Sequence, residues 1–458
     1  MDSEKTTRSN TKMRKTLAVA AISAAILLVI VGLTLLTVWL ATRKDALDYV
    51  GDIRVVELDE KYTSVIDRTD SYLGHPDFVV NDEGKLIVAY PAGHGKGAII
   101  MKESSDFGDT WSERISDLPQ SFEKSQETPT LYNLGGGRLL LVSGCPSWAA
   151  DDEYYADGFN YSMSFDGGAT WSEFKNEYGV EWAASRPDKG DPSYDGVPEE
   201  LLPNFDEIGK VLPYDVIVAM SSLTQLRDED GNLIDKWMGT FHDYDFYNYV
   251  SYLTFDDEGN AEWSAPKKFL HSQRNAEQAA NLCEIEIFRA PAPNDDTLIL
   301  IGRGNSRTTN SLISVSTDEG ETWSELKELP LCLTGDRHKA EYDLATGKVL
   351  ISFRLCLPGM KSSAFSTQNL LGGYWVGWAS DPQELIDYAT GDADKSAAFG
   401  NALIVLGATN DGGTDCGYSG TACKDGTFVL SSYGKFADGA ANPFIMQAKF
   451  NLADVLGL

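Results

Sequence analysis

The sequence predicts an all-β fold, a β-propeller with six blades, preceded by one transmembrane helix. Three observations predict it: a five-residue turn pattern recurs three times, short apolar stretches alternate with turn residues, and one long uncharged run lies near the N-terminus. At 458 residues the chain is too long for one ordinary core, whereas a repeat architecture grows by adding units. Frequent glycine, at 42 residues, and 11% aromatic residues also favour many short strands.

The uncharged run covers residues 16–41. It is long enough to cross a bilayer, which takes about 20 apolar residues in a helix. A cleaved signal peptide has an apolar region of only about 7 to 15 residues and a small-residue cleavage site, but this run ends in TVWLATRKDA without a clean site. We expect a retained signal anchor, with secretion after signal cleavage as the alternative. The basic residues before the run predict that residues 1–15 stay cytoplasmic and that the body beyond a linker at 42–50 is extracytoplasmic.

The recurring pattern is SxDxGxTW. Its three copies are Ser104, Asp106, Gly108, Thr110, Trp111; Ser164, Asp166, Gly168, Thr170, Trp171; and Ser316, Asp318, Gly320, Thr322, Trp323. A degraded copy is formed by Thr254, Asp256, Gly259 and Trp263. The first two copies lie 60 residues apart, which is about the length of one four-stranded blade. Residues 51–458 therefore have room for six blades, with loop insertions near 177–210 and 381–400.

Each copy has the residue types that a tight hairpin turn needs. The Asp side chain can accept hydrogen bonds from the backbone of its own turn, Gly permits a positive φ, and Trp can pack the turn against its blade. The pattern therefore predicts architecture and no direct chemical role.

The formal net charge is -31. The negative electrostatic field of this charge repels nucleic acid and anionic membrane surfaces, so neither is expected as a partner. An anionic ligand would need a local cluster of Arg. The six cysteines and five histidines show no zinc-site spacing, so we expect no metal and no cofactor.

Turns of this kind, known as Asp boxes or BNR repeats, on a six-bladed propeller resemble the sialidase (neuraminidase) superfamily from about Ile53 to the C-terminus. The segments LCEIEIFRAPAPNDDTLILIGRGNSR and GYSGTACKDGTFVLSSYG are similar to the family's segments that carry a Glu, a substrate-carboxylate Arg and a nucleophilic Tyr. The resemblance implies those roles for Glu284, Arg303 and Tyr418. The segments GHPD, YPAGHGKG, SQETPT and LTGDRH further resemble a divergent bacterial sialidase-like subgroup.

The chemistry of sialic acid explains these residue types. Its carboxylate on the anomeric carbon repels an anionic nucleophile, whereas a neutral Tyr activated by a neighbouring Glu can attack. Guanidinium groups bind a carboxylate through two parallel hydrogen bonds. Arg303, Arg337 and Arg354 are the candidates, and Arg307 is a substitute if the strand register shifts.

The first blade departs from the family pattern. Leu73-Gly74-His75-Pro76-Asp77 stands where the family has its first Arg, and the AYPAGHGKG stretch has no carboxylate where the family has its acid/base Asp. The acid candidates are Asp77, Glu127 and Asp243, in that order. His75 and His94 are candidate substrate contacts, and a protonated His94 could also donate a proton.

These observations predict an exo-acting glycoside hydrolase that removes terminal sialic acid from sialylated glycans and glycoconjugates. One alternative is a glycosidase of the same fold that acts on another terminal sugar, through two carboxylates. The other is a non-catalytic, surface-tethered propeller that binds glycans.

Overall fold

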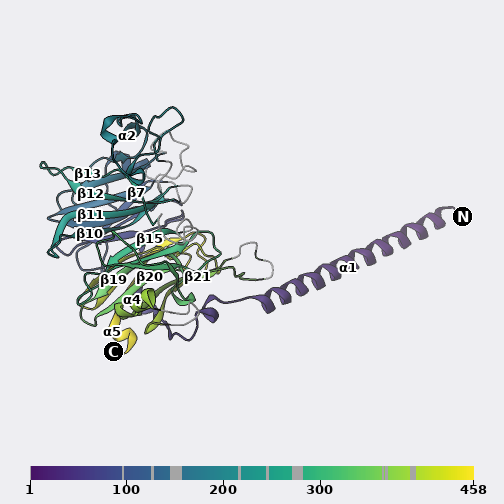
Figure 1. Cartoon of the computed structure of the whole chain (residues 1–458). Coiled ribbons are helices and arrows are strands. Elements are labelled where there is room, and N and C mark those ends of the chain that lie inside the picture. The colour runs from purple at the N-terminus through teal and green to yellow at the C-terminus, as the bar shows by residue number, and fades with distance from the viewer. Residues whose placement is uncertain are drawn as a thin grey trace.

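The computed structural model describes residues 2–94, 97–124, 128–144, 157–214, 218–243, 247–270, 282–363, 366, 370–391 and 399–458. Six sheets form a ring, and one long helix, α1 (Asp2–Thr42), extends away from it (Figure 1). The chain is thus a six-bladed β-propeller, as the sequence predicts. The apolar segment Leu17–Tyr49 could cross a membrane by its length and composition, as an anchor or as a signal sequence.

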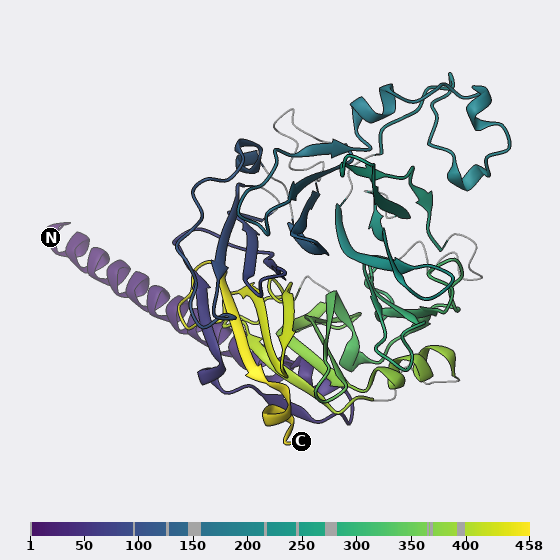
Figure 2. The same ribbon diagram turned by 90° about the vertical axis from the view of Figure 1, so that its left-hand side faces the viewer.

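The sheets follow one another around the ring in chain order (Figure 2). Blade 1 holds β3 (Asp77–Val80), β4 (Leu86–Pro91) and β5 (Ile99–Ser104). Blade 2 holds β6 (Thr130–Gly135), β7 (Arg138–Gly144), β8 (Phe159–Ser164) and β9 (Lys175–Glu177). Blade 3 holds β10 (Val218–Arg227), β11 (Leu233–His242), β12 (Asn248–Phe255), β13 (Ala261–Trp263) and β14 (Lys267–Lys268).

Blade 4 holds β15 (Leu282–Arg289), β16 (Leu298–Gly304), β17 (Leu312–Ser316) and β18 (Lys327–Glu328). Blade 5 holds β19 (Gly335–Asp343), β20 (Lys348–Pro358), β21 (Leu370–Ser380), β22 (Ala402–Ala408) and β1 (Val55–Glu57). Blade 6 holds β23 (Gly420–Lys424), β24 (Thr427–Gly434), β25 (Phe444–Asn451) and β2 (Thr63–Asp67). The first strand of each blade, β1 and β2 aside, lies innermost and contacts the first strands of its neighbours.

The ring is closed by strands from both ends of the propeller sequence. β2 pairs antiparallel with β25, with Thr63 opposite Ala448, so blade 6 is built from the beginning and the end of the propeller. β1 pairs in parallel with β22 in blade 5. Closure of this kind leaves no long sheet edge between the first and last blades exposed.

Apolar side chains fill the spaces between adjacent blades. Blades 4 and 5, for example, share one cluster that contains Ile299, Ile301, Val349 and Phe353, each fully buried. Burial of one such side chain stabilises the fold by about 1.5–3 kcal/mol. The strands thus form a stiff scaffold that fixes the positions of side chains at the ends of the ring.

The three SxDxGxTW turns share one hydrogen-bond pattern. In the last copy, the Ser316 hydroxyl donates to Asp318 Oδ1 at 2.7 Å and accepts from the Gly320 amide at 2.9 Å. The same carboxylate accepts from the amide and hydroxyl of Thr322, at 2.9 and 2.5 Å. All three turns follow the third strand of a blade, so the pattern terminates that strand, and in blades 2 and 4 it leads into the fourth strand.

Among the described residues, helices are short outside α1. These are the 3-10 turns at Ala46–Tyr49, Glu60–Tyr62, Gln120–Lys124, Pro192–Tyr194, Glu199–Leu201 and Leu331–Leu333, and the α-helices α2 (Val180–Ala184), α4 (Pro382–Thr390) and α5 (Leu452–Leu456). The predicted insertion at 177–210 carries α2 and projects from the ring (Figure 2). The predicted insertion at 381–400 begins with the helix α4.

Candidate active site

The two strands nearest the axis of each blade bring the candidate residues to one end of the ring. Because these strands are antiparallel, the start of the first and the end of the second lie at the same end. Glu284 and Arg337 lie near the starts of β15 and β19, and Tyr418 lies just before β23. Arg303 and Arg354 lie towards the ends of β16 and β20. We call this end of the propeller the site face.

Tyr418 and Glu284 are in direct contact there. The Tyr418 hydroxyl donates a hydrogen bond of 2.5 Å to Oε1 of Glu284. Nη1 of Arg303 donates to the same oxygen at 2.8 Å and to the Tyr418 oxygen at 3.4 Å. The Arg354 guanidinium lies over the Tyr418 ring, 4.9 Å from its centroid. The predicted Tyr, Glu and two of the predicted Arg side chains therefore converge.

Burial and the neighbouring charges together set the pKa values of Tyr418 and Glu284. Burial raises the pKa of Tyr418 well above its usual value, and the adjacent Glu284 carboxylate raises it further. Burial alone would also raise the pKa of Glu284, but the Arg303 guanidinium, the Tyr418 hydrogen bond and the Arg354 guanidinium together hold that pKa below its usual value. The resting pair is therefore a neutral phenol beside an ionised carboxylate, which is suited to accept the phenolic proton.

Two β-bulges aim the side chains of blades 4 and 5. The register of β15 shifts between Cys283 and Glu286, and Glu284 there has a φ of 48°. The register of β19 shifts in the same way around Arg337, whose φ is 51°. The Arg337 amide donates to Oε2 of Glu284 at 3.1 Å, while its guanidinium donates to the Ser221 hydroxyl at 3.2 Å. Bulges are a common means of re-aiming side chains at functional sites.

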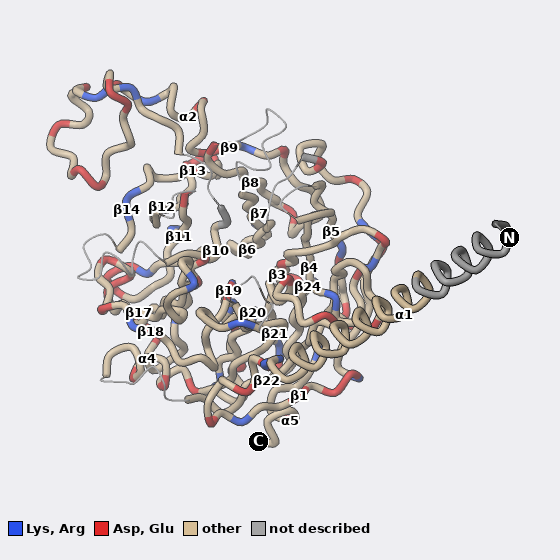
Figure 3. Tube along the Cα trace, turned by 90° about the vertical axis from the view of Figure 1, so that its right-hand side faces the viewer, with Lys and Arg blue, Asp and Glu red and all other residues tan. Residues whose placement is uncertain are grey.

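Asp336, which the sequence analysis did not select, is surrounded by three arginines. Its side chain is fully buried and accepts hydrogen bonds from both Arg307 and Arg354, and the Nε atom of Arg303 lies 3.4 Å from its Oδ1. Burial would raise the pKa of Asp336, but Arg354 and the other two guanidinium groups hold it far below its usual value. The arginine cluster thus already contains one internal carboxylate. Lys and Arg positions near β19 and β20 lie at the centre of the ring in Figure 3.

Aromatic and imidazole rings line the other side of Tyr418. The His75 ring, 3% exposed, lies 5.2 Å from the Tyr418 ring and 4.6 Å from the His94 ring, centroid to centroid. Burial, together with the charges of His94 and Arg354, holds the pKa of His75 well below its usual value, so this imidazole is neutral. Its Nδ1 atom is buried without a hydrogen-bond partner in the described structure.

His94 is linked to Asp415 through a tyrosine. Nδ1 of His94 lies 2.8 Å from the Tyr72 hydroxyl, which donates to Asp415 at 3.1 Å. The Tyr433 hydroxyl donates to the same carboxylate oxygen at 2.9 Å. The side chains of His94 and Asp415 are 53% and 50% exposed, so they border the solvent above the buried Tyr418.

His75, His94 and Asp415 are the group that could hold a metal ion in the described part of the chain, since one ligand atom of each lies within 4.8 Å of the others. The Tyr72 and Tyr433 hydroxyls, however, both donate to Oδ1 of Asp415. The grouping is equally suited to proton transfer, in which a carboxylate orients an imidazole through a hydrogen-bonded neighbour.

The three predicted acid candidates lie in different surroundings. Both oxygens of Asp77, which is 2% exposed, accept backbone hydrogen bonds, from the amides of Phe78 and Leu131 at 3.0 Å each. Asp243 accepts from the Tyr247 amide and the Tyr249 hydroxyl, at 2.9 and 3.1 Å, and so bonds within its own hairpin. Glu127 lies outside the described residues. The role of all three as acid stays a prediction.

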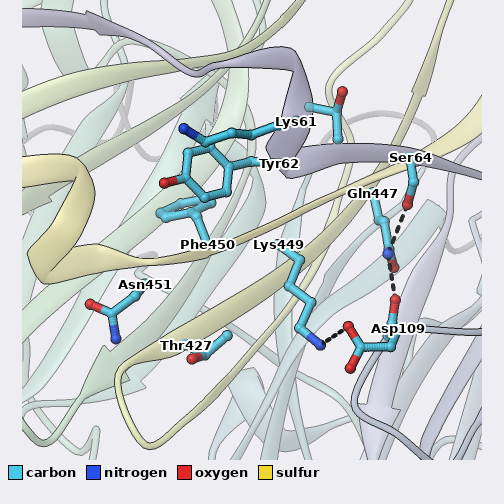
Figure 4. Close-up of a pocket in the computed structure, with 11 residues that line it drawn as sticks. Lys61, Tyr62, Ser64, Asp109, Thr427, Gln447, Lys449, Phe450 and Asn451 are labelled. Atoms are coloured by element: carbon cyan, nitrogen blue, oxygen red, sulfur yellow. Dashed lines mark hydrogen bonds and ion pairs between the residues drawn. The ribbon is translucent and has the colours of Figure 1, made fainter.

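A separate pocket lies on the outer strands of blade 6 and the adjoining turn of blade 1 (Figure 4). Lys449 is paired there with Asp109 at 2.6 Å, and the Gln447 amide donates to the Ser64 hydroxyl at 2.9 Å. Neither the Tyr418 pair nor the arginine cluster contributes to its lining. This pocket is therefore separate from the candidate catalytic residues of the site face.

No family model matches the chain, and no curated protein matches it significantly. Solved structures, however, do superpose on the chain. A protein of unknown function from Dyadobacter fermentans superposes with a TM-score of 0.54 at 18% identity, covering 84% of this chain and 97% of that one. A Hadza microbial sialidase superposes with a TM-score of 0.50 at 14% identity, covering 84% of this chain and 66% of that one.

A Trypanosoma rangeli sialidase has a TM-score of 0.49 at 15% identity, covering 91% of this chain and 59% of that one. The present chain thus spans less than two thirds of the length of these two sialidases. At such identities the likeness concerns the fold alone. The chain has a sialidase-like β-propeller fold.

Proposed function

We propose that this chain is an exo-acting glycoside hydrolase that removes terminal sialic acid from glycoconjugates, with Tyr418 as nucleophile and Glu284 as its base. The contact between the Tyr418 hydroxyl and the Glu284 carboxylate, 2.5 Å long and flanked by two arginines, carries the proposal. A neutral phenol is suited to attack an anomeric carbon that bears a carboxylate, because a charged nucleophile would be repelled.

In the first step the Tyr418 oxygen attacks the anomeric carbon while its proton passes to Glu284, and the bond to the leaving oxygen breaks. The leaving oxygen takes a proton from His94, held by Tyr72 and Asp415 at the solvent border. Water then attacks the glycosyl-tyrosine, gives one proton to His94, and the phenolate recovers its proton from Glu284. We favour His94 over Asp77 as the acid because both Asp77 oxygens bond to backbone amides.

Two observations favour a second candidate, a hydrolase of the same fold that removes a different terminal sugar. Asp336 already neutralises part of the arginine cluster, and His75 stands where a further Arg is expected from the family resemblance. Both reduce the positive charge available to a substrate carboxylate. Such an enzyme would use the same Tyr418–Glu284 pair on a sugar whose substituent is uncharged or placed differently.

One assay separates these functions. The full chain in detergent is incubated with a panel of sialylated glycans and a matched panel ending in neutral sugars, and the released sugars are identified. Release of sialic acid that disappears in Tyr418→Phe supports the proposal. Release from the neutral panel alone favours the second candidate, and glycan retention without release identifies a binding module.

A further inference from the structure

The segment between α1 and the propeller is docked onto the body. The Lys44 amide donates to the Ser362 carbonyl at 3.1 Å, and the Tyr374 hydroxyl donates to the Asp45 carboxylate at 2.7 Å. Ala46 and Val50, 1% and 2% exposed, insert into the apolar cluster of blades 4 and 5. The helix therefore joins the propeller without a flexible tether.

This attachment lies on the site face. Ser362 belongs to the connection between β20 and β21, and Tyr374 lies near the start of β21. That connection is at the same end of blade 5 as Arg354, near the end of β20, and as the start of β19. Figure 3, which views the side from which α1 leaves, shows the helix crossing the rim near β21 and β22.

The anchor also adjoins the loop that carries the proposed nucleophile. A cleft of about 350 Å³ is lined by Trp39 and Arg43 on one side and by residues 409–412 on the other. The same loop continues to Thr414, whose carbonyl accepts from Arg354 at 3.0 Å, and then to Tyr418. The distance from the anchor to the site is therefore set by packed elements.

A spanning helix would bring this face close to the lipid headgroups. The stretch from Leu17 to Trp39 is long enough for the roughly 30 Å of a hydrocarbon core. Trp39, Arg43 and Lys44 are residue types that favour the membrane interface. Because the Lys44 amide is bonded to the Ser362 carbonyl of the propeller, the propeller would lie directly outside the headgroup layer.

We propose that the site face is held towards the membrane that anchors the chain, and that the substrate is a terminal sugar carried by lipids of that same membrane. The orientation rests on the docked anchor; the identity of the substrate rests also on the proposed function. Glycans in solution or on another surface would have to enter between the propeller and the bilayer.

The orientation is tested without reference to activity. A donor dye is attached in the full chain through an azide-bearing residue at Lys361, on the β20–β21 connection, or at Leu344, on the β19–β20 turn. Both positions are exposed, and they lie at opposite ends of β20, whose 11 residues span roughly 35 Å. The chains are reconstituted in vesicles with an acceptor dye on the lipid headgroups.

Energy transfer from position 361 should exceed that from position 344 by at least about twofold, given this separation of roughly 35 Å. Equal transfer, or stronger transfer from 344, overturns the orientation. A chain recovered from cells without residues 1–41 overturns it as well. Neither result depends on whether the protein is an enzyme.

The substrate is tested in the same vesicles with a sialylated glycolipid and a soluble sialylated oligosaccharide. A Gly-Ser spacer of about 20 residues inserted after Thr42 lifts the body by roughly 25 Å. It should lower the ratio of glycolipid to soluble turnover about tenfold, while the soluble rate does not fall because the gap through which soluble glycans enter becomes wider. An unchanged ratio overturns the substrate assignment, and absence of turnover on both substrates without the spacer overturns the proposed function itself, leaving the orientation to the dye measurement.

Discussion

The Tyr418 hydroxyl donates a 2.5 Å hydrogen bond to Glu284, although the two residues lie 134 positions apart and on different blades. Blade 4 supplies the carboxylate from a bulge, and the loop before blade 6 supplies the phenol. Since the pair shares its contact with Arg303, the carboxylate stays ionised and can accept a proton.

Removal of the charge at Glu284 should slow the attack step. Glu284→Gln keeps the shape of the side chain but takes away the proton acceptor, so kcat should fall by about 10²–10⁴-fold. Glu286→Gln is the matched control, because Glu286 lies two residues further along β15 and is also buried. A parallel loss of kcat in both variants would contradict the role of Glu284.

Removal of His94 should affect substrates according to their leaving groups. His94→Ala should lower kcat/KM by about 10²-fold for an alkyl glycoside and by less than about 10-fold for an aryl glycoside whose leaving group needs no protonation. Steady-state rates on the two substrates check it, with Asp415→Asn expected to show a weaker form of the same selectivity. Equal losses on both substrates would mean that His94 is not the acid.

Asp336 should be important for stability. Asp336→Asn leaves three guanidinium groups without their shared carboxylate, and breaking a buried pair costs about 3–5 kcal/mol. Urea unfolding at neutral pH measures the loss. Asp235→Asn, which breaks the more exposed pair with Arg138, is the control and should cost less than about 1 kcal/mol.

Asp336 should also make the stability of the fold depend on pH. Because the pKa of Asp336 is lowered in the folded state, its stabilising contribution is present above the unfolded value of about 4 and declines as the pH falls below it. The stability gap between the parent chain and Asp336→Asn should therefore narrow in acid. A gap that stays constant from pH 7 to about pH 3 would contradict this linkage.

The SxDxGxTW turns should affect stability without affecting the site. Ser316→Ala removes a buried hydroxyl that bonds to both Asp318 and the Gly320 amide, at a cost of about 1–2 kcal/mol. The exposed neighbour Thr317, as Thr317→Ala, should change stability by less than about 0.5 kcal/mol. Because the turn ends a third strand, opposite the site face, kcat/KM should be unchanged in both. A fall in kcat/KM for Ser316→Ala would link the turn to the site.

Much of the fold could be predicted from the sequence because its signals are local. The hydrogen bonds of each SxDxGxTW turn join residues within the turn itself. The composition of the uncharged run is by itself enough to predict α1. Ring closure had no such signal, since β2 meets β25 almost at the other end of the chain. The pairing depends on the curvature of the whole propeller rather than on any motif.

The site could be predicted in part. The segments around Glu284, Arg303 and Tyr418 resemble a known pattern, and these side chains do meet. The role of Asp336 could not be predicted, because the bulge that turns it and its neighbour Arg337 in different directions is not visible in the letters GDRH. Asp415 was missed because its tyrosine partners come from distant segments.

The most direct test of the account is to identify the residue that becomes glycosylated. The full chain is incubated with a difluorinated sialic acid, which slows the second step of a retaining hydrolase, and the modified peptide is sequenced by mass spectrometry. The account predicts one adduct on Tyr418 that is absent from Tyr418→Phe. An adduct on another residue, or release of sialic acid by a Tyr418→Phe chain at the parent rate, would contradict it.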